Sequence, residues 1–294
     1  MGKGFAAMAL AMLTLTAASA LEVGDPAPPV KLLDQSGTLR DVSASYGRWA
    51  VLTFYPVDGT AGCTKEAISI TATLAKIEAA GIDVYGVSTQ DVASKQAFCA
   101  AQGLKHTLLC DTDKSVSAAY GTLLADRGIS GRVTFYIDPT RTIRLIDRAV
   151  QVATHGEDIL AAVTKLAAED AKTPLPKLGE PETFGDLRWT LPADWRRRVA
   201  DGATTLVGPD GLSLTLAAAA GDATKPGALP DGAVKSVDEM ISLDGKPASR
   251  TEWTVGDSFT ARLRWGSETT VDTVTVTGPK AQTTLLRRLL AATR

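Results

Sequence analysis

The chain has 294 residues, of which 45% are hydrophobic and 22% charged, and its formal net charge is −2. This length suits two domains of ordinary size, and the balance of residue types is that of a globular protein. A net charge so near zero offers no basic surface for nucleic acid or for an anionic membrane, so neither class of partner is expected.

The first twenty residues have the pattern of a signal peptide. Lys3 is their only charged residue, an apolar run extends from Phe5 to Thr16, and the segment ends in the small residues Ala18-Ser-Ala20. The apolar run is shorter than the ~20 residues that a membrane-spanning helix needs. We therefore expect cleavage of residues 1–20, a periplasmic or secreted protein, and a mature chain without a membrane span.

Residues 21–171 alternate β-prone apolar runs with helical patterns. Strands are expected over residues 49–55, 82–88, 105–110, 132–138 and 141–150, and helices after residue 63, over residues 92–102 and from residue 154 onward. In the last of these helices Thr154 is the expected N-cap, with Glu157 three residues later, and Ile159, Val163 and Leu166 form the buried face. Strand–helix alternation of this kind predicts an α/β sandwich.

Residues 172–183 differ in composition from what precedes them. They contain Pro174, Pro176 and Pro181 among charged residues, which is typical of an extended linker. We therefore expect a boundary here between two domains.

The remaining segment, residues 184–294, holds four of the five tryptophans in the chain and several runs that alternate like half-exposed strands. Pro209-Asp-Gly211 predicts a hairpin turn, and residues 282–292 predict an amphipathic helix with its leucines inward. The second domain is therefore expected to be a smaller α+β domain with an antiparallel sheet, and nothing in it indicates a function.

The segment around Cys63 carries the strongest chemical signal. A buried strand ends at Pro56, a loop follows, and a helix starts near Cys63, so the thiol faces the free backbone N–H groups of a helix N-terminus. These groups favour the thiolate over the thiol, but by only about 1 kcal/mol. Converting an ordinary thiol largely to thiolate at neutral pH takes about 3 kcal/mol. A second positive group is therefore required near the sulfur.

The run Pro56-Val-Asp-Gly-Thr60-Ala-Gly-Cys63 resembles the P-x-x-x-T-x-x-C active-site motif of peroxiredoxins. Further similarities to the bacterioferritin comigratory protein subfamily, also called peroxiredoxin Q, are Val23-Gly-Asp-Pro-Ala-Pro28, Gly62-Cys-Thr-Lys-Glu66, Gly86-Val-Ser88, Ala119-Tyr-Gly121 and Arg132-Val-Thr-Phe-Tyr-Ile-Asp138. One departure is Ala61, where the subfamily commonly has proline. The resemblance covers residues 21–171 and implies a thioredoxin-like α/β sandwich for that domain.

The resemblance also implies roles for individual residues. Cys63 is the expected peroxidatic cysteine, which attacks a peroxide and becomes a sulfenic acid. Thr60 would hold the thiolate and the peroxide through its hydroxyl, Pro56 would shield the sulfur from water, and Arg132 would supply the missing cation. Simpler interpretations stay open: Cys63 as an inert core thiol, Thr60 as a helix cap with Cys63 at the third helical position, and Arg132 as a surface charge.

The resolving thiol is a separate question. Many members of the subfamily carry it five residues after the first cysteine, where this chain has Ile68, and another branch carries it on the next helix, where Cys99 lies. The resemblance thus implies a Cys63–Cys99 disulfide, which requires a Cα separation below about 7 Å and hence local unwinding of the peroxidatic helix. Cys99 as a small buried hydrophobic residue and Cys110 as the resolving thiol remain alternatives.

The predicted function is that of a thiol-specific peroxidase that reduces hydrogen peroxide and organic hydroperoxides and is recycled by a thioredoxin-like dithiol. No metal or organic cofactor is expected, because His106 and His155 are the only histidines and lack ligand-spaced neighbours. One alternative is a secreted disulfide oxidoreductase, which needs a C-x-x-C pair, whereas Cys63 is followed by Thr64-Lys-Glu66. The other is a non-enzymatic module whose C-terminal domain binds a cell-envelope partner.

Overall fold

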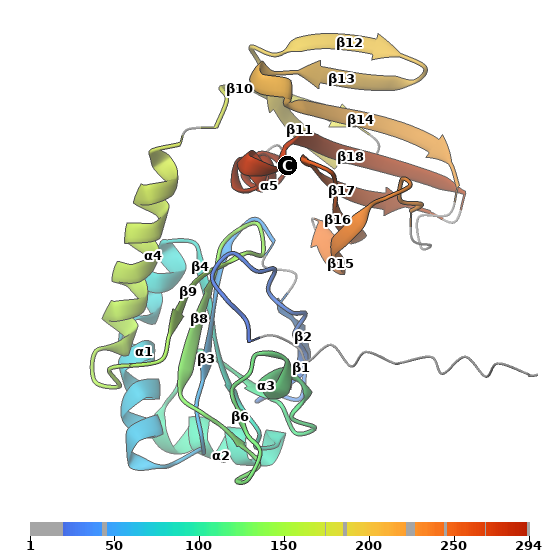
Figure 1. Ribbon diagram of the computed structural model, residues 1–294. Helices are drawn as coiled ribbons and strands as arrows, with labels where there is room; N and C mark the ends of the chain where they lie inside the picture. The colour runs from blue at the N-terminus through green and yellow to red at the C-terminus, as the bar shows by residue number, and fades with distance from the viewer. Residues whose placement is uncertain are drawn as a thin grey trace, which may run out of the picture.

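A computed structural model describes residues 20–42, 46–173, 175–184, 187–221, 227–243, 246–267 and 269–292. In Figure 1 an N-terminal α/β part lies below a C-terminal sheet that carries the last helix. The predicted signal peptide lies outside the described residues, apart from Ala20. No helix among the described residues combines the length and the apolar character needed to cross a bilayer.

The N-terminal part is built on a seven-stranded sheet in the order β2-β1-β5-β4-β3-β8-β9. Its strands are β1 (Lys31–Asp34), β2 (Leu39–Asp41), β3 (Trp49–Phe54), β4 (Ile82–Ser88), β5 (Thr107–Cys110), β8 (Val133–Ile137) and β9 (Ile143–Asp147). Its helices are α1 (Ala61–Ala79), α2 (Val92–Gln102), α3 (Ser115–Ala119) and α4 (His155–Ala171), and β6 (Leu123–Leu124) pairs with β7 (Ile129–Ser130) as a separate hairpin. Because β3, β4 and β5 are parallel while β8 and β9 are antiparallel to their neighbours, the sheet is mixed, and the predicted thioredoxin-like α/β sandwich is confirmed.

Both faces of this sheet are covered, because β3 is buried at every residue and alternates its side chains between them. On one face Val51 packs with Ile70 of α1 and Ile159 of α4. On the other face the ring of Tyr120, which follows α3, lies 5.3 Å from the ring of Phe54 and contacts β8 as well. The central strand therefore sits between two hydrophobic layers.

Most expected elements of this part appear with small differences in length. The strand over residues 82–88 and the helix over residues 92–102 have the expected bounds, and Gly103 ends that helix in the left-handed region at φ +64°. The strands β5, β8 and β9 are shorter than expected by a few residues. The capping box expected at Thr154 does not form, because its hydroxyl donates to the carboxylate of Asp158 at 2.7 Å.

The C-terminal part contains a second seven-stranded sheet in the order β12-β13-β14-β18-β17-β16-β15, together with the pair β10-β11. The strands are β10 (Leu178–Phe184), β11 (Leu187–Pro192), β12 (Arg196–Ala200), β13 (Ala203–Val207), β14 (Ser213–Ala220), β15 (Val234–Leu243), β16 (Lys246–Val255), β17 (Ser258–Gly266) and β18 (Thr270–Pro279). The helical elements are η2 (Pro209–Gly211), η3 (Lys280–Gln282) and α5 (Thr283–Ala292). Every strand pair described in this part is antiparallel, as expected, and η2 forms the predicted turn between β13 and β14.

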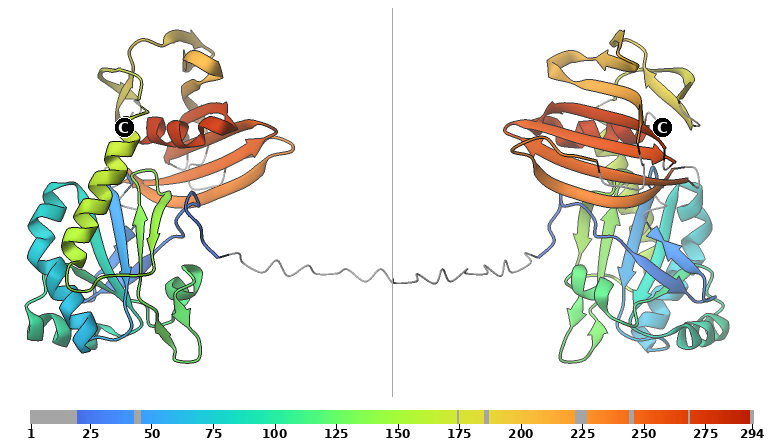
Figure 2. Two further views of the ribbon diagram at one scale, coloured as in Figure 1. Left: turned by 60° about the vertical axis from the view of Figure 1, so that its left-hand side comes forward. Right: turned by 90° about the vertical axis from the view of Figure 1, so that its right-hand side faces the viewer.

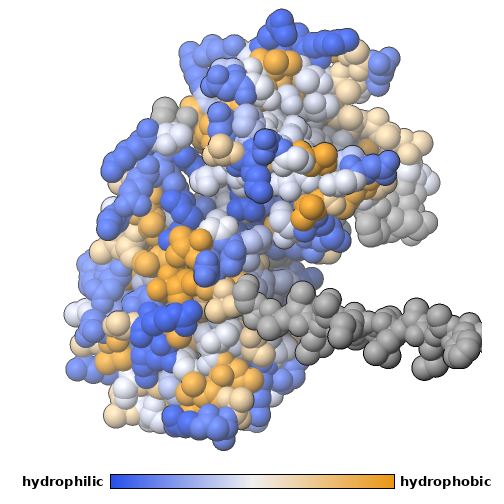
Figure 3. Space-filling model, viewed as in Figure 1, coloured by the Kyte–Doolittle hydropathy of each residue, from blue (hydrophilic) through white to orange (hydrophobic). Residues whose placement is uncertain are grey.

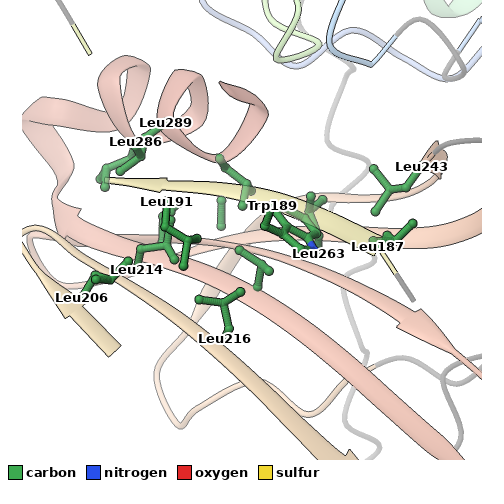
Figure 4. Close-up of a cluster of buried hydrophobic side chains, with 14 of the residues drawn as sticks. Leu187, Trp189, Leu191, Leu206, Leu214, Leu216, Leu243, Leu263, Leu286 and Leu289 are labelled. Carbon is green, nitrogen blue, oxygen red and sulfur yellow. The ribbon is translucent and has the colours of Figure 1, made fainter. Parts of the chain in front are cut away.

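The core of the C-terminal part lies between this sheet and α5 (Figure 4). Leu286 and Leu289 of α5 face leucines of the sheet, and Trp189 stacks on Trp265 with ring centroids 5.2 Å apart. The inward leucines predicted for the last helix are therefore confirmed, and the four tryptophans of this part are buried. Arg287 of α5 is also buried, which an amphipathic pattern does not indicate.

The expected linker is only partly irregular. Its second half, from Leu178, forms strand β10, which pairs with β11 and shows a register shift before Pro181. Most of β10 is exposed, so its sequence lacks the apolar alternation of a half-buried strand and resembles a linker. The structure therefore extends the C-terminal part back to residue 178.

The exposed edge of the large C-terminal sheet is protected by charge. Arg196, Arg197 and Arg198 of the edge strand β12 are exposed, and the surface over β12 and β13 is mostly hydrophilic in the space-filling view (Figure 3). Charged side chains on an edge strand discourage pairing with other chains.

The two parts meet at the end of the N-terminal sheet where β3 begins. Trp49, the first residue of β3, lines a cavity together with Arg288 and Ala291 of α5. The opposite end of β3 leads into α1, whose first turn lies far from the C-terminal sheet in all views (Figures 1 and 2). The C-terminal part therefore does not cover the start of α1.

Candidate active site

Cys63 occupies the third position of α1. Helix α1 begins at Ala61 after the extended N-cap residue Thr60, so the backbone N–H groups of its first turn have no partner within the helix. The Cys63 side chain is 2% exposed and packs beneath this turn. The expected arrangement of a thiol at a helix N-terminus is thus present.

Arg132 lies directly against this thiol. Its Nη2 donates a hydrogen bond to Sγ of Cys63 at 3.2 Å. The sheet explains the contact, because β3 pairs with β8 and places Val133 opposite Phe54, so the residue before β8 lies beside the loop that leads to Cys63. A positive group therefore lies in contact with the sulfur of Cys63.

Thr60 and Pro56 frame the loop between β3 and α1. The hydroxyl of Thr60 donates to the carbonyl oxygen of Val57 at 3.1 Å and makes no capping bond to the helix, so the interpretation of Thr60 as a side-chain cap is wrong. Pro56 is half-buried, and its carbonyl oxygen accepts from Nε2 of Gln90 at 3.5 Å. Thr60 is exposed, and its oxygen lone pairs remain available to accept a hydrogen bond.

Glu66 is a functional candidate that the sequence analysis named only as part of a motif. It lies three residues after Cys63, on the same side of α1, and is 3% exposed. Its carboxylate contacts Nη1 of Arg132 on one side and lies 2.9 Å from Nδ1 of His155 on the other. Neither contact has hydrogen-bond geometry, so both are close polar contacts between buried groups.

His155 completes this row of polar groups behind the thiol. Its side chain is fully buried at the start of α4, and Nε2 lies 3.0 Å from Oγ1 of Thr134. Burial lowers the pKa of His155 to about 4, so the ring is neutral at neutral pH. The close approach of α4 to α1 requires Gly156, because a Cβ there would lie 2.4 Å from the carbonyl oxygen of Ser69.

The three cysteines are free thiols and differ in their surroundings. Cys63 and Cys99 pack against the same hydrophobic cluster, which also contains Phe98 and Leu108. Cys110 lies in β5, paired with β1 on one side and β4 on the other, and burial raises the pKa of its thiol as it raises that of Cys99. Since a central strand cannot move without breaking two ladders, Cys99 on α2 is the better placed resolving candidate.

Known proteins match the N-terminal part of the chain. The AhpC/TSA family model matches residues 23–146. Peroxiredoxin Bcp of Xanthomonas campestris is 34% identical over 134 residues, which is 43% of this chain and 83% of that protein. Peroxiredoxin Q from the chloroplast of Populus jackii is 32% identical over 145 residues, which is 49% of this chain and 68% of that protein.

Solved structures of such proteins match the same part. That of a cysteine-to-serine mutant of Xylella fastidiosa peroxiredoxin Q is 30% identical and covers 51% of this chain and 99% of its own, with a TM-score of 0.47. That of the Xanthomonas campestris bacterioferritin comigratory protein is 31% identical and covers 47% of this chain and 92% of its own, with a TM-score of 0.44. From the sequence relatives, the chain belongs to the peroxiredoxin family of thiol peroxidases, in its Bcp and peroxiredoxin Q branch, and carries an additional C-terminal domain.

Proposed function

We propose that this protein reduces hydrogen peroxide and organic hydroperoxides through Cys63 and is recycled by a thioredoxin-like dithiol. The observation that carries the proposal is the 3.2 Å contact between Arg132 and the sulfur of Cys63. A guanidinium in contact with the sulfur stabilises the thiolate, which is the nucleophilic form.

The chemistry begins with attack of the Cys63 thiolate on the terminal peroxide oxygen. A sulfur–oxygen bond forms as the O–O bond breaks, and the leaving hydroxide or alkoxide takes up a proton to become water or an alcohol. Arg132 stabilises the negative charge that develops on the leaving oxygen. Cys63 itself is buried, but Thr60 beside it is exposed and the Arg132 side chain is 23% exposed, so two groups around the sulfur reach solvent.

Resolution then requires a second thiol. The thiol of Cys99 attacks the sulfenic acid of Cys63, a disulfide forms, and water leaves. The shared hydrophobic cluster of Cys63 and Cys99 supports this pairing. Both residues lie in helices, so the helices must loosen before the Cα atoms reach disulfide distance. A dithiol protein reduces the disulfide by thiol–disulfide exchange.

The decisive experiment is peroxide consumption by residues 21–294 with a thioredoxin system. Cys63→Ser should abolish turnover, and Cys99→Ser should leave a persistent sulfenic acid. Cys110→Ser is the matched control and should turn over normally. Mass spectrometry after one equivalent of peroxide should find a Cys63–Cys99 link. A Cys63–Cys110 link, or no internal link, would contradict the assignment.

We also propose that the protein acts outside the cytoplasm, in the periplasm or as a secreted protein. The support is the pattern of residues 1–20, with one charged residue, an apolar run and a small-x-small end. Cell fractionation and N-terminal sequencing test this. A mature N-terminus at Leu21 in the exported fraction is expected, and an intact Met1 in the cytoplasm would contradict it.

A further inference from the structure

Lys95 of α2 is fully buried, although lysine is almost never found without exposure to water. Its Nζ donates to the hydroxyl oxygens of Ser88 at 2.6 Å and Tyr55 at 2.9 Å and lies 3.5 Å from Oδ1 of Asp58. The peroxidase chemistry described above gives this amine no part. The amine lies against the loop that carries Pro56 and Thr60, so we ask what its burial there does for this loop.

Asp58 is the point where this network enters the catalytic loop. Its side chain is 5% exposed and accepts hydrogen bonds from the hydroxyl of Tyr55 at 2.6 Å and from that of Ser94 at 2.7 Å. Its backbone N–H donates to Oε1 of Gln90 at 3.3 Å. The loop is therefore bonded to the end of β4 and to the first turn of α2.

The same helix carries the candidate resolving thiol. Cys99 follows Lys95 by four residues, which is about one helical turn. Burial lowers the pKa of Lys95, and the carboxylate of Asp58, 3.5 Å away, opposes that shift more than any other group does. Separating a buried ion pair leaves a charge without compensation, so opening α2 and opening the loop are energetically coupled.

We propose that Lys95 and Asp58, with Tyr55, Ser88 and Ser94, form a latch that ties the catalytic loop to α2. The latch sets how long oxidised Cys63 stays in the peroxide-reactive arrangement before Cys99 can reach it. Lys95 is a positioning residue, since it touches neither the peroxide nor the sulfur. This inference rests on the proposed Cys63–Cys99 disulfide.

The latch decides between two fates of the sulfenic acid. While it is closed, a second peroxide can oxidise the Cys63 sulfenic acid to sulfinic acid, releasing water or an alcohol. Once it is open, the Cys99 thiol displaces water from the sulfenic acid and forms the disulfide. A weaker latch therefore shifts the outcome from sulfinic acid toward disulfide.

The test compares Lys95→Met and the milder Ser94→Ala with the unaltered chain, counting sulfinic acid formed per turnover by mass spectrometry at increasing peroxide. We expect Lys95→Met to lower that fraction about fivefold and to speed disulfide formation, within the range for losing a hydrogen bond to a buried charge. Ser94→Ala should act in the same direction and keep the fold. In Lys95→Met the carboxylate of Asp58 has lost its cation. Adding Asp58→Asn removes that carboxylate and should bring the sulfinic acid formed per turnover part of the way back to that of the unaltered chain.

Two control variants separate the latch from general destabilisation. Lys76→Met makes the same chemical change at an exposed surface ion pair. Val163→Ala removes buried contacts on α4. Neither variant should change the amount of sulfinic acid formed per turnover. In a Cys99→Ser background, Lys95→Met should no longer protect Cys63. An unchanged partition in both Lys95→Met and Ser94→Ala, with the Cys63–Cys99 link still formed, overturns the latch alone. Failure of the unaltered chain to form that link overturns the latch and the proposed resolving step together.

Discussion

The guanidinium of Arg132 and the sulfur of Cys63 are 3.2 Å apart, although the two residues are separated by 69 positions in the sequence. The pairing of β3 with β8 brings them together, since β3 leads into the loop before Cys63 and β8 begins directly after Arg132. The central sheet therefore places the guanidinium of Arg132 against the sulfur of Cys63.

Replacing Arg132 with Ala should lower both the thiolate fraction of Cys63 at neutral pH and its rate with peroxide. A hydrogen bond to a charged group contributes about 1.5–3 kcal/mol, so the peroxide rate should fall about 10- to 100-fold. Arg132→Lys keeps the positive charge but loses the second N–H donor group of the planar guanidinium. Its thiolate fraction and peroxide rate should lie between those of Arg132→Ala and the unaltered chain. Stopped-flow peroxide kinetics and the pH dependence of iodoacetamide alkylation measure the two effects.

The matched control for this prediction is Arg127→Ala, in the exposed turn between β6 and β7. It removes the same charge from an exposed turn that precedes Arg132 in the sequence and should leave both measurements unchanged. An alkylation profile of Arg132→Ala that overlays that of the unaltered chain would remove Arg132 from thiolate stabilisation.

Glu66→Gln should separate the orientation of Arg132 from its charge. The buried carboxylate contacts Nη1 of Arg132 while Nη2 faces the sulfur, so its loss lets the guanidinium turn. We expect the peroxide rate to fall about tenfold, equivalent to about 1.4 kcal/mol. The thiolate fraction should fall less than in Arg132→Ala, because the charge of Arg132 stays and a negative charge near the sulfur has been removed.

The comparison variant is Glu157→Gln, which alters an exposed surface ion pair with Lys76. Pairs of this kind contribute little, so it should behave like the unaltered chain. An unchanged peroxide rate in Glu66→Gln would show that Arg132 keeps its orientation without the Glu66 carboxylate.

Local sequence pattern is enough to predict most strands and helices of the N-terminal domain and the place of Cys63 at a helix start. The end of α2 follows from Gly103, and the place of Cys63 at a helix start follows from the strand and the short loop before it. The choice of Arg132 as the cation comes from family resemblance. Glu66 and His155 are not predicted as a pair because their contact depends on the close packing of α1 against α4 at Gly156, which no local pattern encodes.

The same limit applies to the C-terminal domain. The leucines of α5 are expected to be buried, but Arg287 is buried too, because it donates to the buried carboxylate of Glu252. Glu252 lies on a strand far from α5 in the sequence, so the pattern of α5 does not reveal this contact. The sequence of β10 resembles that of a linker, because the segment becomes a strand only through its pairing with β11. In both cases a contact between segments far apart in sequence overrides the local preference.

Acid should destabilise the fold through its two buried histidines. Burial lowers the pKa of His106 and of His155 to about 4, whereas a histidine in the unfolded chain has its usual value near 6.5. Between pH 6.5 and 4 the unfolded state therefore binds more protons, and stability is lost as the pH falls through this window. At pH 5 each histidine should cost about 2 kcal/mol relative to pH 7.

Urea unfolding midpoints from pH 7.5 to 4.5 measure this loss. His106 lies outside the active site and contacts Oγ1 of Thr71 at 3.2 Å, so His106→Gln is the informative variant. It should be less stable at pH 7 but show about half the dependence on pH, since one of two titrating groups has gone. A slope that matches the unaltered chain would assign the acid sensitivity to other groups.

The last prediction concerns the contact between the two domains. Arg287 donates to Glu252 through Nη2 at 2.6 Å and to Oγ1 of Thr142, at the edge of the peroxiredoxin sheet, through Nη1 at 3.1 Å. Burial alone would raise the pKa of Glu252, but Arg250 and Arg287 together hold it below its usual value, so the carboxylate is charged inside the core. Removing one partner of a buried pair typically costs about 3–5 kcal/mol.

Arg287→Met should therefore lower the unfolding temperature of the C-terminal domain and speed proteolysis between α4 and β10, while the rate of Cys63 with peroxide stays unchanged. The peroxide rate should not change because Thr142 and α5 lie at the end of the sheet where β3 begins, whereas Cys63 follows the opposite end of β3. Thr142→Val, which removes only the hydrogen bond between the domains, should reproduce a small part of the destabilisation. A fall in the peroxide rate that exceeds the loss of folded protein would show instead that the C-terminal domain acts on the thiol from a distance.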